Sequence, residues 1–183
     1  PSATALRERI CQAGTPHLTL EDLGSALDYA LLKSTDLTRY KDISPDLAGR
    51  IRRSLPDHRT IQELIEHCRT RAFTDGRIRR GLMQCLLGIT AAAPSMPYLR
   101  LLGLRKEPAE KGASPLLSQT PDSCQILSRL AADVKKLTPG ALSLFQQDLF
   151  ASELYRQTWC RKYNMHLPNE YQCSPIIIAQ WRH

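Results

Sequence analysis

Apolar residues recur three or four positions apart along most of the stretch between Thr19 and Ile89. This spacing places them on one face of a helix, so the stretch can bury itself only as packed amphipathic helices. Pro45, Pro56 and Thr60 mark starts and stops that keep each helix short. The pattern predicts helices over residues 2–12, 19–33, 45–55, 61–68 and 75–89.

The apolar pattern changes beyond Pro94. The runs "YLRLLGL" (98–104) and "SPLLS" (114–118) are short and bounded by glycine or proline, which predicts two buried strands paired in a small sheet. Helical spacing then returns from Ile126 to Leu137, a long helix is expected over 139–160, and 176–178 is expected to be extended. The predicted fold class is therefore mainly α with a small β-sheet (α+β).

The 183 residues are 42% apolar, enough to build a folded core. The longest uncharged apolar stretch, Gly81 to Met96, is interrupted and falls short of the roughly 20 residues that a membrane span needs. The six cysteines form no CxxC pair. We therefore expect a cytoplasmic protein with reduced thiols and no membrane partner.

Positive charge is concentrated in one part of the chain. Between Gly49 and Arg80 there are nine arginines, four acidic residues and no lysine, within a chain of net charge +7. A guanidinium group matches phosphate oxygens with two parallel hydrogen bonds and stacks on bases, whereas lysine serves as a point charge. A polyanion is the expected partner of this region.

The segment "RTRAFTDGRIRRGLMQCLLGIT" predicts how these arginines are presented. If Thr74 begins a helix, the apolar residues from Ile78 to Ile89 form its buried face and the basic residues gather near its start. Two alternatives stay open: the arginines could be a solvated face, and the aromatic ring could belong to the core instead of stacking on a base. The predicted RNA-binding residues are Arg69, Arg71, Phe73, Thr74, Arg77 and Arg80.

The sequence contains none of the common metal-binding, hydrolase or nucleotide-binding motifs. The five histidines form no HxxxH or HxH pair, which argues against a metal site. There is no GxSxG, no Walker A motif and no dinucleotide-binding GxGxxG. We expect no catalytic residue and no metal ligand in this chain, which by itself looks more like a binding module than a complete enzyme.

The first residues, "SATALR", resemble the last signature motif of the HIGH-type nucleotidyltransferases. The blocks "RTRAFTDGRIRR", "YLRLLGL", "SPLLS", "DLFASELYR" and "EYQCSPIII" follow in the order found in the carboxy-terminal half of the bacterial tRNA(Met) cytidine acetate ligase family. The resemblance extends from Ser2 to Ile178.

The resemblance implies a concrete activity. Members of that family use ATP, with Mg²⁺, to activate acetate as acetyl-adenylate and then acetylate the wobble cytidine of elongator tRNA(Met). It implies that Ser2, Thr4 and Arg7 help to bind the ATP phosphates. It also implies that residues 1–15 are the remnant of a nucleotidyltransferase domain, that 16–183 are a mainly helical, tRNA-binding carboxy-terminal domain, and that the catalytic Rossmann-like amino-terminal domain is absent.

Two other functions remain open at this stage. The chain could be a noncatalytic RNA-binding module that never had a catalytic domain. It could also come from a nucleotidyltransferase relative that acts on another acceptor. In the ligase hypothesis the partners are tRNA, ATP, acetate and the missing domain, and the fragment alone is inactive.

Overall fold

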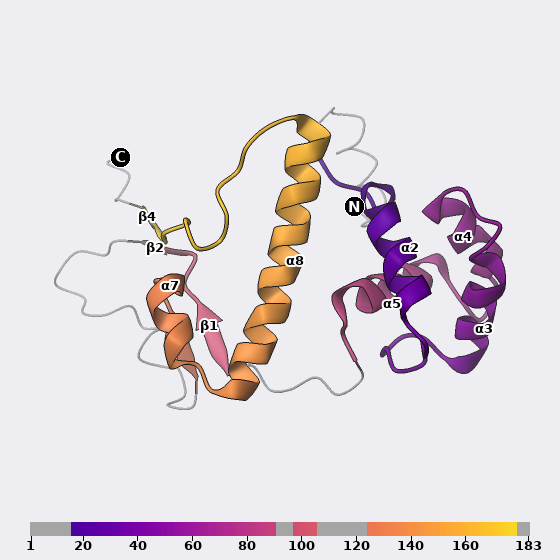
Figure 1. The fold of residues 1–183 in the computed structure, drawn as a ribbon, viewed down its shortest axis with the longest axis horizontal. Coiled ribbons are helices and arrows are strands. Elements are labelled where there is room, and N and C mark those ends of the chain that lie inside the picture. The colour runs from indigo at the N-terminus through magenta and orange to yellow at the C-terminus, as the bar shows by residue number, and fades with distance from the viewer. Residues whose placement is uncertain (1–15, 91–96, 106–123, 179–183) are drawn as a thin grey trace. The chain divides into compact units, whose positions relative to one another are not determined.

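The computed structural model describes residues 16–90, 97–105 and 124–178 (Figure 1). These residues form two compact units. The first contains the described residues up to Thr90 together with Arg161–Asn164, and the second contains those from Pro97 to Cys160 and from Met165 onward. The predicted domain boundary at residue 15 lies outside the described residues and stays a prediction.

The first unit is a set of short helices. They follow the predicted pattern, with a single 3-10 turn before the first one. These elements are η1 (Glu21–Leu23), α2 (Gly24–Lys33), α3 (Pro45–Ser54), α4 (Ile61–Cys68) and α5 (Asp75–Leu87).

Local hydrogen bonds explain where the helices begin. The Ser44 hydroxyl accepts from the Leu47 N–H at the start of α3, where Pro45 occupies the first position. The Thr60 hydroxyl accepts from the Glu63 N–H at 3.1 Å at the start of α4. A side-chain acceptor at this position satisfies one of the free N–H groups of a helix end, so these caps fix the boundaries that the sequence predicted.

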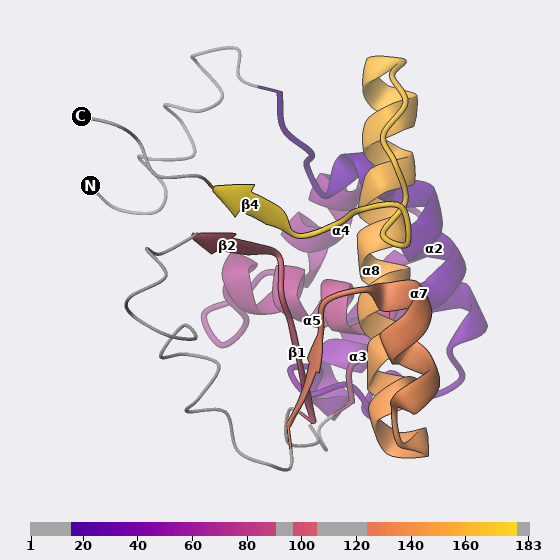
Figure 2. The ribbon, with the colours of Figure 1, turned by 90° about the vertical axis from the view of Figure 1, so that its left-hand side faces the viewer.

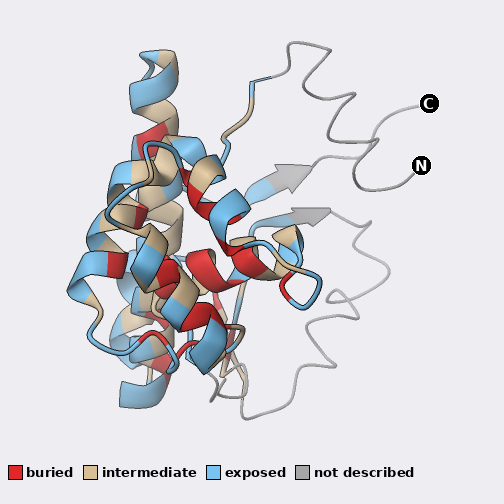
Figure 3. Cartoon of the chain, turned by 90° about the vertical axis from the view of Figure 1, so that its right-hand side faces the viewer, coloured by how far each residue is buried: buried red, intermediate tan, exposed pale blue. Residues whose placement is uncertain are grey.

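The core of the first unit lies where the apolar faces of these helices meet. Figure 3 shows the buried positions in red, most of them on the short helices. Each helix contributes fully buried aliphatic residues, as their periodicity predicted. They include Leu27, Leu31, Leu47, Ile51, Ile61, Leu64, Ile65, Ile78 and Leu82.

The end of α5 differs from the prediction. Gly88 adopts φ 70°, a left-handed conformation that ends the helix, and the Ile89 N–H donates to the Gln84 carbonyl at 2.8 Å. This is a common way to stop a helix, and it favours glycine because a Cβ is strained there. The expectation of a buried Ile89 was wrong, because this residue follows the helix and is 39% exposed.

The second unit combines short strands with one long helix. Its elements are β1 (Tyr98–Arg100), β2 (Gly103–Arg105), β3 (Gln125–Leu127), α7 (Leu130–Asp133), the 3-10 turn η3 (Val134–Lys136), α8 (Pro139–Tyr163, of which residues up to Cys160 belong to this unit) and β4 (Ile176–Ile178). β1 pairs in parallel with β3, and β2 pairs in parallel with β4. In Figure 2 the β2 and β4 arrows lie next to each other.

The core of the second unit forms between β1, β3 and the start of α8. The rings of Tyr98 and Phe145 meet edge to face, with 5.9 Å between centroids, and both side chains are buried. The Tyr98 hydroxyl donates to the Asp148 carboxylate. Leu127, Leu130 and Ala141 complete this cluster.

The single strand predicted over 98–104 is two strands in the structure. The Leu101 N–H donates to the Leu127 carbonyl at 2.9 Å, whereas the Leu102 carbonyl accepts from the Ile176 N–H at 3.0 Å. The chain therefore changes partner strand between these two residues. Apolar periodicity does not record which strand a backbone pairs with, and the predicted partner segment 114–118 lies outside the described residues.

The helical pattern predicted from Ile126 was wrong at its beginning, because residues 125–127 form β3. The Asp133 carboxylate accepts the N–H groups of Ser128 and Arg129, both at 2.9 Å, and so starts the helix only at Leu130. These backbone bonds lower the pKa of Asp133 to about 2. The mainly helical fold with small sheets and the extended Ile176–Ile178 segment are both confirmed.

Candidate nucleic-acid interface

A tight turn links α4 to α5 and carries the first of the predicted RNA-binding residues. The Thr70 N–H donates to the Phe73 carbonyl, and the Phe73 N–H donates to the Thr70 hydroxyl, both at 3.1 Å. This reciprocal pair closes the turn and leaves Arg71 at its tip. Arg69 and Arg71 are exposed, and neither side chain makes a hydrogen bond or ion pair with another described residue.

Phe73 holds the turn against the first unit. Its side chain is 8% exposed, and the Arg77 guanidinium lies over its ring at 5.2 Å from the centroid. The Arg77 Nε also donates to the Asp42 carbonyl at 3.4 Å. This geometry favours packing as the main role of Phe73, the alternative that the sequence left open, with Arg77 positioned by the ring.

Asp42, in the loop between α2 and α3, contacts the remaining arginine of the predicted set, Arg80, which lies on α5. The Arg80 Nε lies 3.4 Å from the Asp42 carboxylate, and Gln84 donates to the same carboxylate at 2.7 Å. The Arg80 side chain nevertheless stays 64% exposed. An exposed pair of this kind contributes little to stability, so Arg80 can exchange Asp42 for another anion at small cost.

Thr74 stands immediately before α5 as predicted, but its hydroxyl does not cap the helix. The Thr74 backbone carbonyl instead accepts the N–H groups of Arg77 and Ile78, at 3.0 and 3.1 Å. The hydroxyl of this exposed residue is thus not required to hold the helix start.

Two further arginines of the basic region have structural roles. Arg52 donates to the backbone carbonyls of Leu31 and Ser34, which ties α3 to the end of α2. Arg79 pairs with Asp75 at 2.8 Å and donates to Gln62 at 2.6 Å. Sequence composition counted all nine arginines alike, whereas the structure separates those that fasten the helices from those that face outward.

Sequence reasoning missed a hollow next to the turn. It has a volume of about 460 Å³ and lies between α3 and the α4–α5 turn. Arg50 and Arg53, one turn apart on α3, contribute its positive charge. The full lining is Pro45, Asp46, Gly49, Arg50, Arg53, Thr70, Ala72 and Phe73. The excess of arginines on α3 was visible in the sequence, but their convergence on the turn depends on helix packing.

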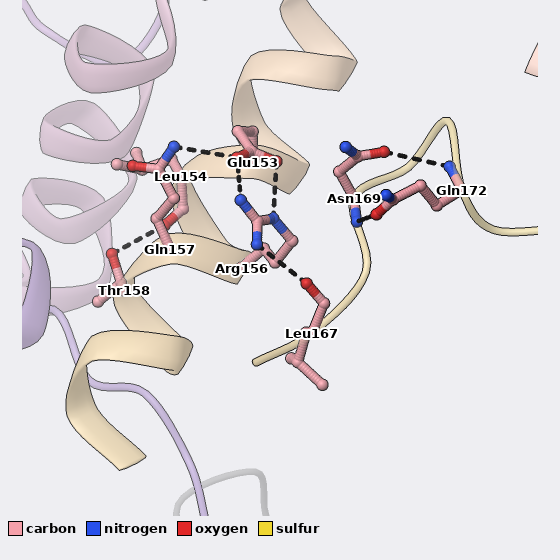
Figure 4. A network of polar contacts seen from close by, with 8 residues as sticks. All are labelled: Glu153, Leu154, Arg156, Gln157, Thr158, Leu167, Asn169 and Gln172. Atoms are coloured by element: carbon pink, nitrogen blue, oxygen red, sulfur yellow. Dashed lines mark hydrogen bonds and ion pairs between the residues drawn. The ribbon is translucent and has the colours of Figure 1, made fainter. Parts of the chain in front are cut away.

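A hollow of about 570 Å³ in the second unit has a different electrostatic character. Its arginine, Arg156, is bound by Glu153 and donates to the Leu167 carbonyl at 3.0 Å (Figure 4). The Arg156 guanidinium and a bond from Gln157 lower the pKa of Glu153 to about 2. Because this guanidinium is already neutralised, this hollow suits a polyanion less well than the hollow between α3 and the α4–α5 turn does.

The other predicted sites cannot be placed. Ser2, Thr4 and Arg7, expected at the ATP phosphates, lie outside the described residues. Within residues 16–90, 97–105 and 124–178 no group of three or more His, Cys, Asp or Glu residues could hold a metal ion. In the same parts of the chain no helix has the length and apolarity needed to cross a membrane.

The sequence of this chain is similar to a known protein family and to several named proteins. The family model described as HIGH Nucleotidyl Transferase matches residues 1–169. A Streptococcus sanguinis protein named tRNA(Met) cytidine acetate ligase is 32% identical over 161 residues, covering 79% of this chain and 42% of its own length. A Streptococcus gordonii protein of the same name is 33% identical over 144 residues, covering 70% of this chain and 38% of its own length.

Two solved structures share the fold. The apo crystal structure of Thermotoga maritima TmcAL superposes with a TM-score of 0.72 over 96% of this chain and 45% of that chain, at 17% identity. The same protein bound with alpha-thio ATP gives a TM-score of 0.71 over 94% of this chain, at 19% identity. The chain thus spans less than half the length of the relatives it matches.

Proposed function

The chain belongs to the HIGH nucleotidyl transferase family, and on this basis we propose that it is part of an ATP-dependent ligase that modifies tRNA. The relatives that match most of this chain carry the name tRNA(Met) cytidine acetate ligase, which supports the proposal. In this proposal the acceptor is the wobble cytidine of elongator tRNA(Met), acetate is activated as acetyl-adenylate, and the place of action is the cytoplasm.

We assign this chain the carboxy-terminal part of such an enzyme. It matches relatives more than twice its length, which is what a part of a larger ligase would do. The remaining part of the protein would be the Rossmann-like domain that carries the catalytic residues. The phosphates of ATP, bound as its Mg²⁺ complex, would be held in part by Ser2, Thr4 and Arg7. The isolated chain would be inactive.

The surface assigned to tRNA is formed by the α4–α5 turn and the start of α5. The observation that carries this assignment is the exposure of Arg69 and Arg71 without an acidic partner among the described residues, on a turn fixed by the Thr70–Phe73 bonds. Positively charged side chains on a fixed frame suit contacts to RNA phosphates. Arg77, Arg80, Thr74 and Phe73 complete the proposed surface, with Phe73 acting through Arg77.

A salt series on the double variant R69A/R71A tests this assignment. If each arginine binds one phosphate, the slope of log affinity for tRNA against log salt should flatten by about 1.4, because each phosphate left unbound removes roughly 0.7. The control variant K135A/K136A removes the same charge from exposed positions of η3 and should keep the wild-type slope. An R69A/R71A slope equal to that of the control would exclude the turn from the RNA surface.

A further inference from the structure

The hollow between α3 and the α4–α5 turn is lined by a glycine inside a helix. Gly49 lies in the middle of α3, and a Cβ placed on it would meet no atom within 4 Å beyond its chain neighbours and the backbone of its own helix. Glycine is disfavoured inside helices, and here no neighbouring side chain requires it. Close packing therefore does not explain the glycine at this position. Its lack of a side chain keeps the hollow open.

Two arginines line the hollow beside Gly49. The Arg53 Nε donates to the Gly49 carbonyl at 3.3 Å, which holds the Arg53 side chain along α3. Among the described residues, its two terminal nitrogens have no hydrogen-bond partner. Arg50, next to Gly49, also lines the hollow, and neither guanidinium forms an ion pair with a described residue. Thr70 and Phe73 bound the hollow from the turn.

One acidic residue, Asp46, lines the same hollow. With two arginines its carboxylate leaves a net charge of +1 at the site. That charge matches the single negative charge of a phosphodiester better than the higher charge of a free phosphate. The carboxylate also supplies an acceptor that a ribose hydroxyl can use.

We propose that the hollow above Gly49 receives one phosphodiester of the RNA backbone, bound by Arg50 and Arg53, with Asp46 facing the adjoining ribose. The inference rests on the proposed function, since it extends the tRNA surface from the α4–α5 turn onto α3. It adds Gly49, Arg50, Arg53 and Asp46 to the residues that contact RNA.

The direct test is to fill the hollow with Gly49→Leu. Leucine favours the helix and meets open space, so the variant should unfold at a temperature no lower than that of the wild type. Its Kd for tRNA should rise about tenfold, the effect expected for removal of one charge-assisted hydrogen bond, and its salt slope should flatten by roughly 0.7. Gly140→Leu is the matched control, because Gly140 is exposed on α8 and also has open space around its Cβ position.

The outcomes separate this inference from the function on which it rests. An unchanged Kd in folded G49L, with wild-type binding intact, would overturn the inference and leave the tRNA surface standing. Absence of tRNA binding by the wild-type chain would overturn both.

Two further measurements identify the ligand of the hollow and provide a test if G49L fails to fold. Loss of ATP or inorganic phosphate binding in G49L, with tRNA affinity unchanged, would overturn the assignment to RNA in favour of a free phosphate ligand. If G49L does not fold, R50A/R53A tests the same interactions and should flatten the salt slope by roughly 0.7, because the two arginines are proposed to bind a single phosphate. An unchanged slope in that variant would overturn the inference.

Discussion

Individual arginines in this chain differ in function according to their hydrogen-bond partners. Arg52 donates to two backbone carbonyls and fastens α3 to α2, whereas Arg71 extends from a turn without a partner among the described residues. The sequence predicted the basic region and a polyanion partner because charge composition alone carries that information. It could not distinguish Arg52 from Arg71, because the carbonyls that bind Arg52 lie 18 and 21 residues away.

The Glu153 carboxylate gives a prediction at the scale of one residue. Its pKa is lowered to about 2 by hydrogen bonds from Arg156 and then Gln157. Since the folded-state pKa lies below the unfolded value of about 4.3, this residue stabilises the fold above that pH, and the contribution is lost as the pH falls towards 2. An NMR titration of the Glu153 side-chain carboxyl carbon should give a midpoint near pH 2.

The matched variant for this titration is Arg156→Met, which keeps an unbranched apolar stem and removes the guanidinium group with its charge. The Glu153 midpoint should then move up towards its ordinary value. A midpoint near 4 in the wild-type chain would contradict the ion pair.

At the scale of elements, the starts of α3 and α4 were predicted correctly, whereas one apolar run was assigned to the wrong element. Ser44 and Thr60 begin helices where the sequence predicted them, because a cap acts within three residues. Strands β1 and β3 depend on each other across 27 residues, and Ile126 and Leu127 were predicted as helix because their apolar spacing fits either structure. In this segment the apolar spacing therefore gave the wrong element, because pairing with a distant strand determined the outcome.

A long-range cap on α4 could not be predicted from local sequence. The Glu21 carboxylate, from the turn before α2, accepts the N–H groups of Ile61 at 3.1 Å and Gln62 at 2.6 Å. Glu21→Ala leaves both groups without this acceptor and should lower the free energy of unfolding by about 1 kcal/mol, as for removal of a helix cap. Urea unfolding followed by circular dichroism measures the change.

Glu66→Ala is the control for this cap, because Glu66 lies on the exposed face of α4 and its side chain binds only the Gln62 side chain among the described residues. It should change the free energy of unfolding by less than about 0.5 kcal/mol. Equal effects of the two substitutions would mean that the Glu21 cap does not stabilise α4.

At the scale of the whole molecule, the chain combines two compact units whose fold is shared with a nucleotide-binding relative. The mainly helical class could be predicted because helical periodicity is a local signal that covers most of the chain. The proposed tRNA surface is assembled from α3, the α4–α5 turn and α5, so its complete residue set required the packed structure. The ATP site predicted at Ser2, Thr4 and Arg7 stays a prediction.

The most direct test of the central claim is the Kd of this 183-residue chain for elongator tRNA(Met) at two salt concentrations, with an unrelated tRNA measured in parallel. Because the proposed surface acts through arginine contacts to phosphates, affinity should fall steeply as salt is raised. Recognition of the methionine tRNA predicts tighter binding to it than to the unrelated tRNA. No binding to either tRNA at the lower salt concentration would contradict the claim that this chain is the tRNA-binding part of a ligase.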